Sequence, residues 1–441
     1  MMTNSATPRR VPRPQPLLGL YRLLSPEVAR NPYPLYQRLR TEDPVCWDPF
    51  LKVWVVTRYQ DVVTVLCDRR FSALRTPTPQ DLGQLGLGKL SPIAEVLVRQ
   101  MLFLDPPAHT RLRSLAAKAL TPRRVERLRT HIQQIVDGLL DAVEPAGALD
   151  VVADLAAPLP GIVTAELLGL PRADGHQLKA WSLDFATVLG NFQHNVDGAS
   201  RVLKSLDEMT RYFAAKVREQ RVRPHEGLIH SLLAAEVAGD RLADEEVVAN
   251  AIMMMVGGQE TTTSLIGTGT LLLLRQPDLL DAVRSYPTLL PSAIEEFLRY
   301  ESPIQHTARM AAEDLELGGK QIRKRQAVIA VLGAANRDPE RFPDPDRVDL
   351  CRPDNRHLAF GWAAHFCFGA PLARVEAQVA FETMLRRFPH LRLATDTLLW
   401  QENLAYRGLK TLPVSFGDAR AVVPATGDGK ARKVAAQEGA R

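Results

Sequence analysis

Cysteine is scarce in this chain of 441 residues, which has only Cys46, Cys67, Cys351 and Cys367. These four form neither the CxxC pair of a zinc knuckle nor the dense spacing of a disulfide framework. We therefore expect no disulfide scaffold, and at least three of the four should be ordinary core or surface thiols.

Long apolar runs are missing as well. A membrane-spanning helix needs about 20 consecutive apolar residues, whereas the run Leu271–Leu274 ends at Arg275 and Gln276. The arginine- and proline-rich start has no apolar block after it, unlike a secretory signal. We predict a cytoplasmic protein without a membrane anchor.

Signatures of nucleic-acid binding are also absent. The net charge is +5, but no basic stripe interleaved with aromatics and no DNA- or RNA-binding motif is seen. Most of this charge is interpreted as solvated surface. One arginine-rich stretch suits an acidic protein partner, since electrostatics raises encounter rates; it contains Arg123, Arg124, Arg127 and Arg129.

The composition is that of a globular protein, with 46% hydrophobic and 24% charged residues, enough to bury a large core. Residues 1–16 and 418–441 lack apolar periodicity, and we predict that they are disordered tails. No linker interrupts the chain between them. Residues 17–417 are therefore predicted to form one domain.

Two segments have strand-like patterns and the remainder is mainly helical. The segment Val53–Val65 shows strand alternation followed by a helical pattern, and Leu315–Leu332 is strand-like with a turn at Gly318 and Gly319. The predicted fold class is mainly α with small β-sheets (α+β).

The longest helix is predicted over Asp244–Arg275, about 48 Å at 1.5 Å per residue. Its middle, VGGQETTT, holds poor helix formers, and each glycine costs about 1 kcal/mol relative to alanine. The Thr261 hydroxyl can reach the carbonyl of Gly257, which bends a helix and opens its backbone to a small ligand. Glu260 beside Thr261 makes an acid and alcohol pair that could relay protons.

The strongest motif is FGWAAHFCFGAPLAR, from Phe360 to Arg374. A cysteine just before a helix N-terminus has its thiolate stabilised by unpaired backbone N–H groups and the helix dipole, so Cys367 is a candidate permanent ligand. Gly369 would let the backbone approach something flat and bulky, and Phe360 could cover the sulfur.

This segment resembles the haem-binding loop of the cytochrome P450 family. The resemblance implies heme b with Cys367 as the axial iron ligand, and a single-domain P450 fold whose long central helix lies over the haem. VGGQETTT resembles the family's oxygen-activating groove, which implies that Glu260 and Thr261 deliver protons. The family usually has glycine where Ala363 stands; a non-glycine residue at positive φ costs about 1–2 kcal/mol.

Two further motifs follow the family's order between about Asn31 and Val414. Glu296 and Arg299, with Arg341, resemble its buried Glu-Arg-Arg network, which supports the fold and haem seating. LDPPAHTRLR places two donors on one helix face. The resemblance implies four donors for the two haem propionates: His109, Arg113, Arg309 and His365.

By this resemblance the chain is a haem-thiolate monooxygenase that hydroxylates or epoxidises a lipophilic small molecule, a secondary metabolite. Electrons would come from a separate ferredoxin or flavodoxin with its reductase, since too few residues follow Cys367 for a fused reductase. The predicted substrate pocket contains Phe185, Leu189, Phe192, Met254, Val256, Gly257, Ile304 and Gln305. For several of these residues, packing in the core is the alternative interpretation.

Three alternatives share the haem. A peroxygenase would keep Cys367, although those relatives tend to replace the acid and alcohol pair with a basic residue. A phenol- or aryl-coupling oxidase has the same sequence features, and product analysis separates it. A non-catalytic haem sensor belongs to another class, which failure to consume NAD(P)H would favour.

Overall fold

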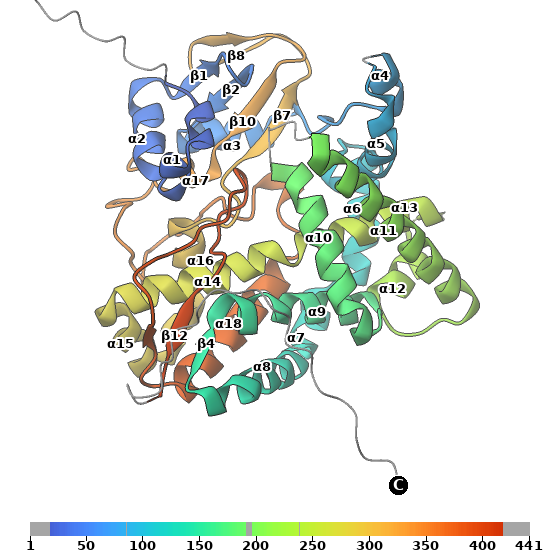
Figure 1. Ribbon diagram of the computed structural model, residues 1–441. Helices are drawn as coiled ribbons and strands as arrows, with labels where there is room; N and C mark the ends of the chain where they lie inside the picture. Colours follow the sequence, from blue (N-terminus) through green and yellow to red (C-terminus); the bar gives the residue numbers. More distant parts are fainter. Residues whose placement is uncertain (1–17, 85, 191–195, 238, 418–441) are drawn as a thin grey trace, which may run out of the picture.

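The computed structural model describes residues 18–84, 86–190, 196–237 and 239–417. The predicted tails, 1–16 and 418–441, lie outside the described residues. Helices dominate the structure, and a twisted sheet with short helices against it forms one end of the molecule (Figure 1). This arrangement confirms the predicted class, mainly α with small sheets.

The helices are described in chain order. The first half of the chain contains α1 (Pro26–Arg30), α2 (Tyr33–Glu42), α3 (Tyr59–Cys67), α4 (Pro79–Gln84), α5 (Ser91–Leu97), α6 (Ala108–Ala119), α7 (Pro122–Arg127), α8 (Arg129–Val143), α9 (Pro158–Leu168), α10 (Gly175–Gly190) and α11 (Val196–Val222). The second half contains α12 (Leu228–Ala234), α13 (Asp244–Gly257), α14 (Glu260–Arg275), α15 (Pro277–Ser285), α16 (Leu290–Tyr300), α17 (Leu332–Ala335) and α18 (Ala370–Arg387).

The main sheet has the strand order β1-β2-β10-β7-β3. Only β2 and β10 run parallel, with Ala327 opposite Val53. Its strands are β1 (Val45–Asp48), β2 (Val53–Val56), β3 (Phe71–Ser72), β7 (Thr307–Ala311) and β10 (Ala327–Ala330). The smaller sheets use β4 (Ala148–Asp150), β5 (Glu236–Val237), β6 (Asp240–Arg241), β8 (Leu315–Leu317), β9 (Lys320–Ile322), β11 (Arg392–Leu393) and β12 (Pro413–Ser415).

Both strand predictions are confirmed. The first segment forms β2 and then α3, and the second forms β8, β9 and β10. The turn between β8 and β9 has φ of +57° at Gly318 and +73° at Gly319. A Cβ on Gly318 would also lie 2.7 Å from Cγ2 of Val45, so this turn requires glycine for conformation and for space.

The helix predicted over Asp244–Arg275 forms as two helices, and the interruption lies within the stretch of poor helix formers in its middle. The chain forms α13 and α14, separated by Gly258 and Gln259, and α14 runs across the middle of the molecule (Figure 1). A Cβ on Gly258 would lie 2.7 Å from Oγ1 of Thr164 on α9. Close packing therefore demands glycine at the break, and glycine weakens the helix there.

Helix α18, which follows the cysteine loop, packs directly against α14. A Cβ on Gly269 of α14 would lie 2.6 Å from Cζ of Phe381 on α18 and 2.9 Å from Cδ2 of Phe297 on α16. Both phenylalanines are fully buried, and burying such a ring contributes roughly 1.5–3 kcal/mol. The missing side chain of Gly269 thus sets the spacing of the two helices that carry the site.

One helical stretch in the described part of the chain, Val151–Leu168, is long and apolar enough to cross a membrane. Within the fold 72% of it is buried. A core helix of a soluble protein passes the same test, so this stretch is weak evidence for a membrane span.

Candidate functional site

The cysteine loop is a tight turn that ends at the N-terminus of α18. The backbone N–H of Cys367 donates to the carbonyl of Phe360 at 2.8 Å, and Ala363 takes a φ of +54°. This is the left-handed conformation that glycine adopts without strain, so alanine costs about 1–2 kcal/mol here. The positive φ considered for Ala363 from the sequence is confirmed.

Burial raises the pKa of the Cys367 thiol, but several groups favour its thiolate. Backbone N–H groups of Gly369 and Ala370 hydrogen bond to it, and the charges of Arg113 and Arg374 also lower the pKa. Arg374 is held by Glu295 at 2.7 Å. The loop therefore presents a sulfur surrounded by donors and cations, an environment that suits a metal-bound thiolate.

The four predicted propionate donors lie together. The rings of His109 and His365 are 4.2 Å apart, and Arg113 donates to the carbonyl of Phe366, in the cysteine loop, at 2.8 Å. Burial lowers the pKa of His365 to about 3, and the charges of Arg309, His109, Arg75 and Arg113 act in the same direction. Four cationic or donor side chains from three segments, namely α6, β7 and the segment after β3, thus converge on His365.

Anions are scarce around this cluster. Asp105 is the one acid that raises the pKa of His109, Arg75 and Arg309 among the described residues. Its Oδ1 already accepts the backbone N–H of Ala73 at 2.7 Å, and its Oδ2 accepts the Ser72 hydroxyl. Nδ1 of His109 is buried with no hydrogen-bond partner in the described structure. This donor set fits a ligand with two carboxylates, as haem has.

Open space beside two glycines also fits a flat cofactor. A Cβ built on Gly257 of α13 or on Gly369 of the cysteine loop meets no atom within 4 Å. Gly257 is exposed although its neighbour Val256 is buried at 2% exposure. Both glycines therefore leave room for a ligand on the loop side and the helix side of the site.

The acid and alcohol pair lies where α14 begins. The Thr261 hydroxyl donates to the carbonyl of Gly257 at 3.0 Å, as the sequence predicts. Glu260 is 6% exposed, and its Oε2 accepts a hydrogen bond of 3.2 Å from Nε2 of Gln401. Burial raises the pKa of Glu260, while Gln401 and the charge of Lys179 lower it.

Gln401 belongs to a C-terminal hairpin that packs on α14. Its backbone N–H donates to the carbonyl of Gly408 at 2.9 Å, and a Cβ on Gly408 would lie 3.1 Å from Cβ of Ser264. The sequence gives no signal for Gln401, because this residue lies 141 residues after Glu260 in a segment without a motif. The hairpin holds the amide against the acid.

The model of the cytochrome P450 family matches residues 175–285 and 288–404. The chain belongs to the cytochrome P450 family. Like the family's members it binds heme b, and it is a monooxygenase, an oxidoreductase that uses O₂.

Its relatives are bacterial P450s of nearly the same length. A biotin biosynthesis cytochrome P450 of Bacillus subtilis is 38% identical, covering 89% of this chain and 98% of its own. The monooxygenase PikC of Streptomyces venezuelae is 40% identical, covering 92% and 95%. The structure of P450BioI in complex with acyl carrier protein ligated to hexadec-9Z-enoic acid superposes with a TM-score of 0.84 at 37% identity, covering 89% and 99%.

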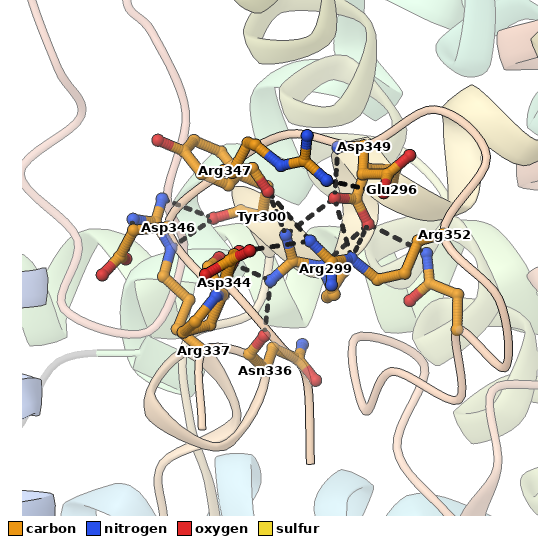
Figure 2. A network of polar contacts seen from close by, with 12 residues as sticks. Glu296, Arg299, Tyr300, Asn336, Arg337, Asp344, Asp346, Arg347, Asp349 and Arg352 are labelled. Carbon is orange, nitrogen blue, oxygen red and sulfur yellow. Dashed lines mark hydrogen bonds and ion pairs between the residues drawn. The ribbon is translucent and has the colours of Figure 1, made fainter. Parts of the chain in front are cut away.

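The buried ionic network of this P450 differs from the prediction in one member. Figure 2 shows Glu296 between Arg299 and Arg352; Nη2 of Arg299 lies 2.7 Å from Oε1 of Glu296, and Nε of Arg352 lies 3.2 Å from Oε2. Arg341 instead pairs with Asp354 at 3.0 Å near the surface. The predicted position of Arg341 in this network is therefore wrong: Arg352, and not Arg341, pairs with Glu296.

The predicted substrate pocket of this P450 is only partly described. Phe185 and Val256, at 1% and 2% exposure, lie inside the packed core. Met254 and Ile304 are half-buried at the edge of that core. Gln305 is buried, and its Oε1 has no partner among the described atoms. Phe192 and the side chain of Leu189 lie outside the described residues.

Proposed function

We propose that this P450 binds haem through Cys367 and hydroxylates or epoxidises a lipophilic small molecule of secondary metabolism. The observation that carries this proposal is the convergence of His109, Arg113 and Arg309 on the cysteine loop, beside the thiol. Named relatives act in secondary metabolism: one is called a polyketide biosynthesis P450 and another nocardicin C N-oxygenase.

The donors around His365 would seat the cofactor. Arg113, Arg309, His109 and His365 would bind its two carboxylates through charge-assisted hydrogen bonds, which are the stronger kind. The bound haem supplies the O₂ chemistry. The protein's part is to hold the substrate and to deliver protons to the haem site.

Glu260 and Thr261 would carry those protons. Because burial raises the pKa of Glu260, its carboxyl gains a proton more readily than an exposed glutamate. The protonated carboxyl of Glu260 would give up its hydrogen bond with Gln401 and pass its proton toward the Thr261 hydroxyl. That hydroxyl is oriented by its own hydrogen bond to Gly257, so its lone pairs can accept.

A separate ferredoxin or flavodoxin, with its reductase, would supply electrons. Of the four arginines in the basic stretch, Arg123 and Arg127 are exposed and have no ion pair in the described structure. Arg124 is fixed to the hydroxyl of Ser231 at 2.7 Å, and Arg129 pairs with Glu126 at 2.6 Å. The two free guanidiniums suit an acidic partner.

Turnover tests this proposal. The purified holoprotein is combined with a ferredoxin, its reductase and NAD(P)H, and lipophilic compounds that shift the haem spin state serve as substrates. We expect NAD(P)H-dependent products that contain one atom of ¹⁸O from ¹⁸O₂. Products formed equally well with peroxide alone would instead support a peroxygenase, and coupled products without ¹⁸O would support an atypical oxidase.

A further inference from the structure

Arg75 is a half-buried arginine without an ion pair in the described structure. It follows β3, in the segment that leads to α4. Its guanidinium lies 4.5 Å above the ring of Phe103. Nη1 makes two long hydrogen bonds of 3.4 Å, to the carbonyls of Ala73 and Leu102. These contacts orient the guanidinium but leave most of its five N–H groups unused.

Burial is costly for this group. Burial and the positive charge of Arg309 lower the pKa of Arg75 to about 9, although Asp105 opposes both effects. Asp105 makes no ion pair with Arg75 among the described residues, and its two oxygens accept from Ser72 and Ala73. Arginine keeps its proton in proteins, so the site calls for another anion.

The position of Arg75 identifies that anion. Ser72 of β3 lies opposite Met310 of β7, so the segment that carries Arg75 runs beside the strand of Arg309, whose charge acts on Arg75. Asp105 holds Ser72 and Ala73 and precedes α6, from which Arg113 reaches the cysteine loop. The three guanidiniums therefore face one site. With Asp105 the protein provides three positive charges and one negative charge here, and the two carboxylates of haem make the sum zero. A carboxylate of the substrate would leave the cluster with an excess of negative charge.

We propose that Arg75 is a third guanidinium bound to the haem carboxylates, beside Arg309. The assignment rests on the haem seat proposed above. It gives the segment between β3 and α4 a direct bond to the cofactor. Haem binding therefore fixes this segment, and loss of the bond weakens haem retention.

Haem transfer measures this bond without turnover. Ferric holoprotein is mixed with excess apomyoglobin, and haem loss is followed in the Soret band for the wild type, Arg75→Gln and Arg75→Lys. Losing a charge-assisted hydrogen bond should speed haem loss by about tenfold or more in Arg75→Gln, with a smaller effect in Arg75→Lys. Arg70→Gln is the matched control, because among the described residues the exposed side chain of Arg70 bonds to Asp68 alone.

Iron protoporphyrin IX dimethyl ester separates this role from packing. The ester lacks the carboxylate anions, so Arg75→Gln and the wild type should lose it at the same rate. An Arg75→Gln effect that persists with the ester would overturn the proposal in favour of packing on Phe103. Unchanged loss of natural haem would also overturn it, while a normal CO spectrum of the wild type would leave the function itself intact.

Discussion

Arg352 and Arg341 give a paired test of the buried network. The side chain of Arg352 is 5% exposed and that of Glu296 is fully buried; Arg352 also donates to the carbonyls of Pro343 and Arg347 at 2.6 and 3.0 Å. Breaking a buried pair costs about 3–5 kcal/mol because a charge is left without its partner. Arg299 still binds Glu296 in this variant, so the loss of stability in Arg352→Gln should lie at the lower end of that range.

Arg341 should behave differently. Its partner Asp354 is 53% exposed, and exposed pairs contribute about 0–1 kcal/mol. Urea unfolding of both holoproteins, followed by circular dichroism and by the Soret band, gives the two free energies of unfolding. Equal losses for Arg352→Gln and Arg341→Gln, or a larger loss for Arg341→Gln, would refute the assignment of Arg352 to the network.

Three further substitutions follow from the geometry. Ala363→Gly should stabilise the cysteine loop by about 0.5–1 kcal/mol, since relief of strain at positive φ exceeds the entropy that glycine adds to the unfolded chain; urea unfolding measures it. Gln401→Leu removes a hydrogen bond that favours ionised Glu260, so the pKa of Glu260 rises. Because the protonated carboxyl is the form that donates a proton, the alkaline limb of the plot of product formed per NAD(P)H against pH should move to higher pH. Gly269→Ala should destabilise the protein by about 1–3 kcal/mol through overpacking, more than the helix propensity of alanine restores.

Two controls match these substitutions. Gln321→Leu removes an exposed amide that donates to Glu316 at 2.8 Å, and it should leave the pH profile unchanged. Gly138→Ala adds a methyl group that meets no atom within 4 Å on α8, so it should stabilise by up to about 1 kcal/mol. A pH shift in Gln321→Leu, or a loss of stability in Gly138→Ala, would contradict the local explanations.

Local patterns predicted the parts of the site that depend on neighbours in sequence. The Thr261 hydroxyl reaches Gly257 because the two are four residues apart, whereas the positive φ of Ala363 was raised by the resemblance to a family that has glycine at this position. The poor helix formers indicated a weak point in the helix over Asp244–Arg275, but the full interruption at Gly258 depends on α9, where Thr164 fills the space of a side chain. Helix propensity alone could not show at which residue α13 ends.

Contacts between residues far apart in the sequence could not be predicted either. Arg341 and Arg352 are both arginines in proline-rich loops after α16, and only the path of the chain decides which one reaches Glu296. Arg75 and Gln401 carry no motif at all. Their partners come from distant segments, so the sequence offered no signal for either side chain.

The most direct test of the central claim is the visible spectrum of the ferrous protein with carbon monoxide. Thiolate ligation by Cys367 predicts a strongly red-shifted Soret band in the wild type and its loss in Cys367→His. A wild-type band of the histidine-ligated kind, or the same spectrum in both proteins, would contradict Cys367 as the iron ligand.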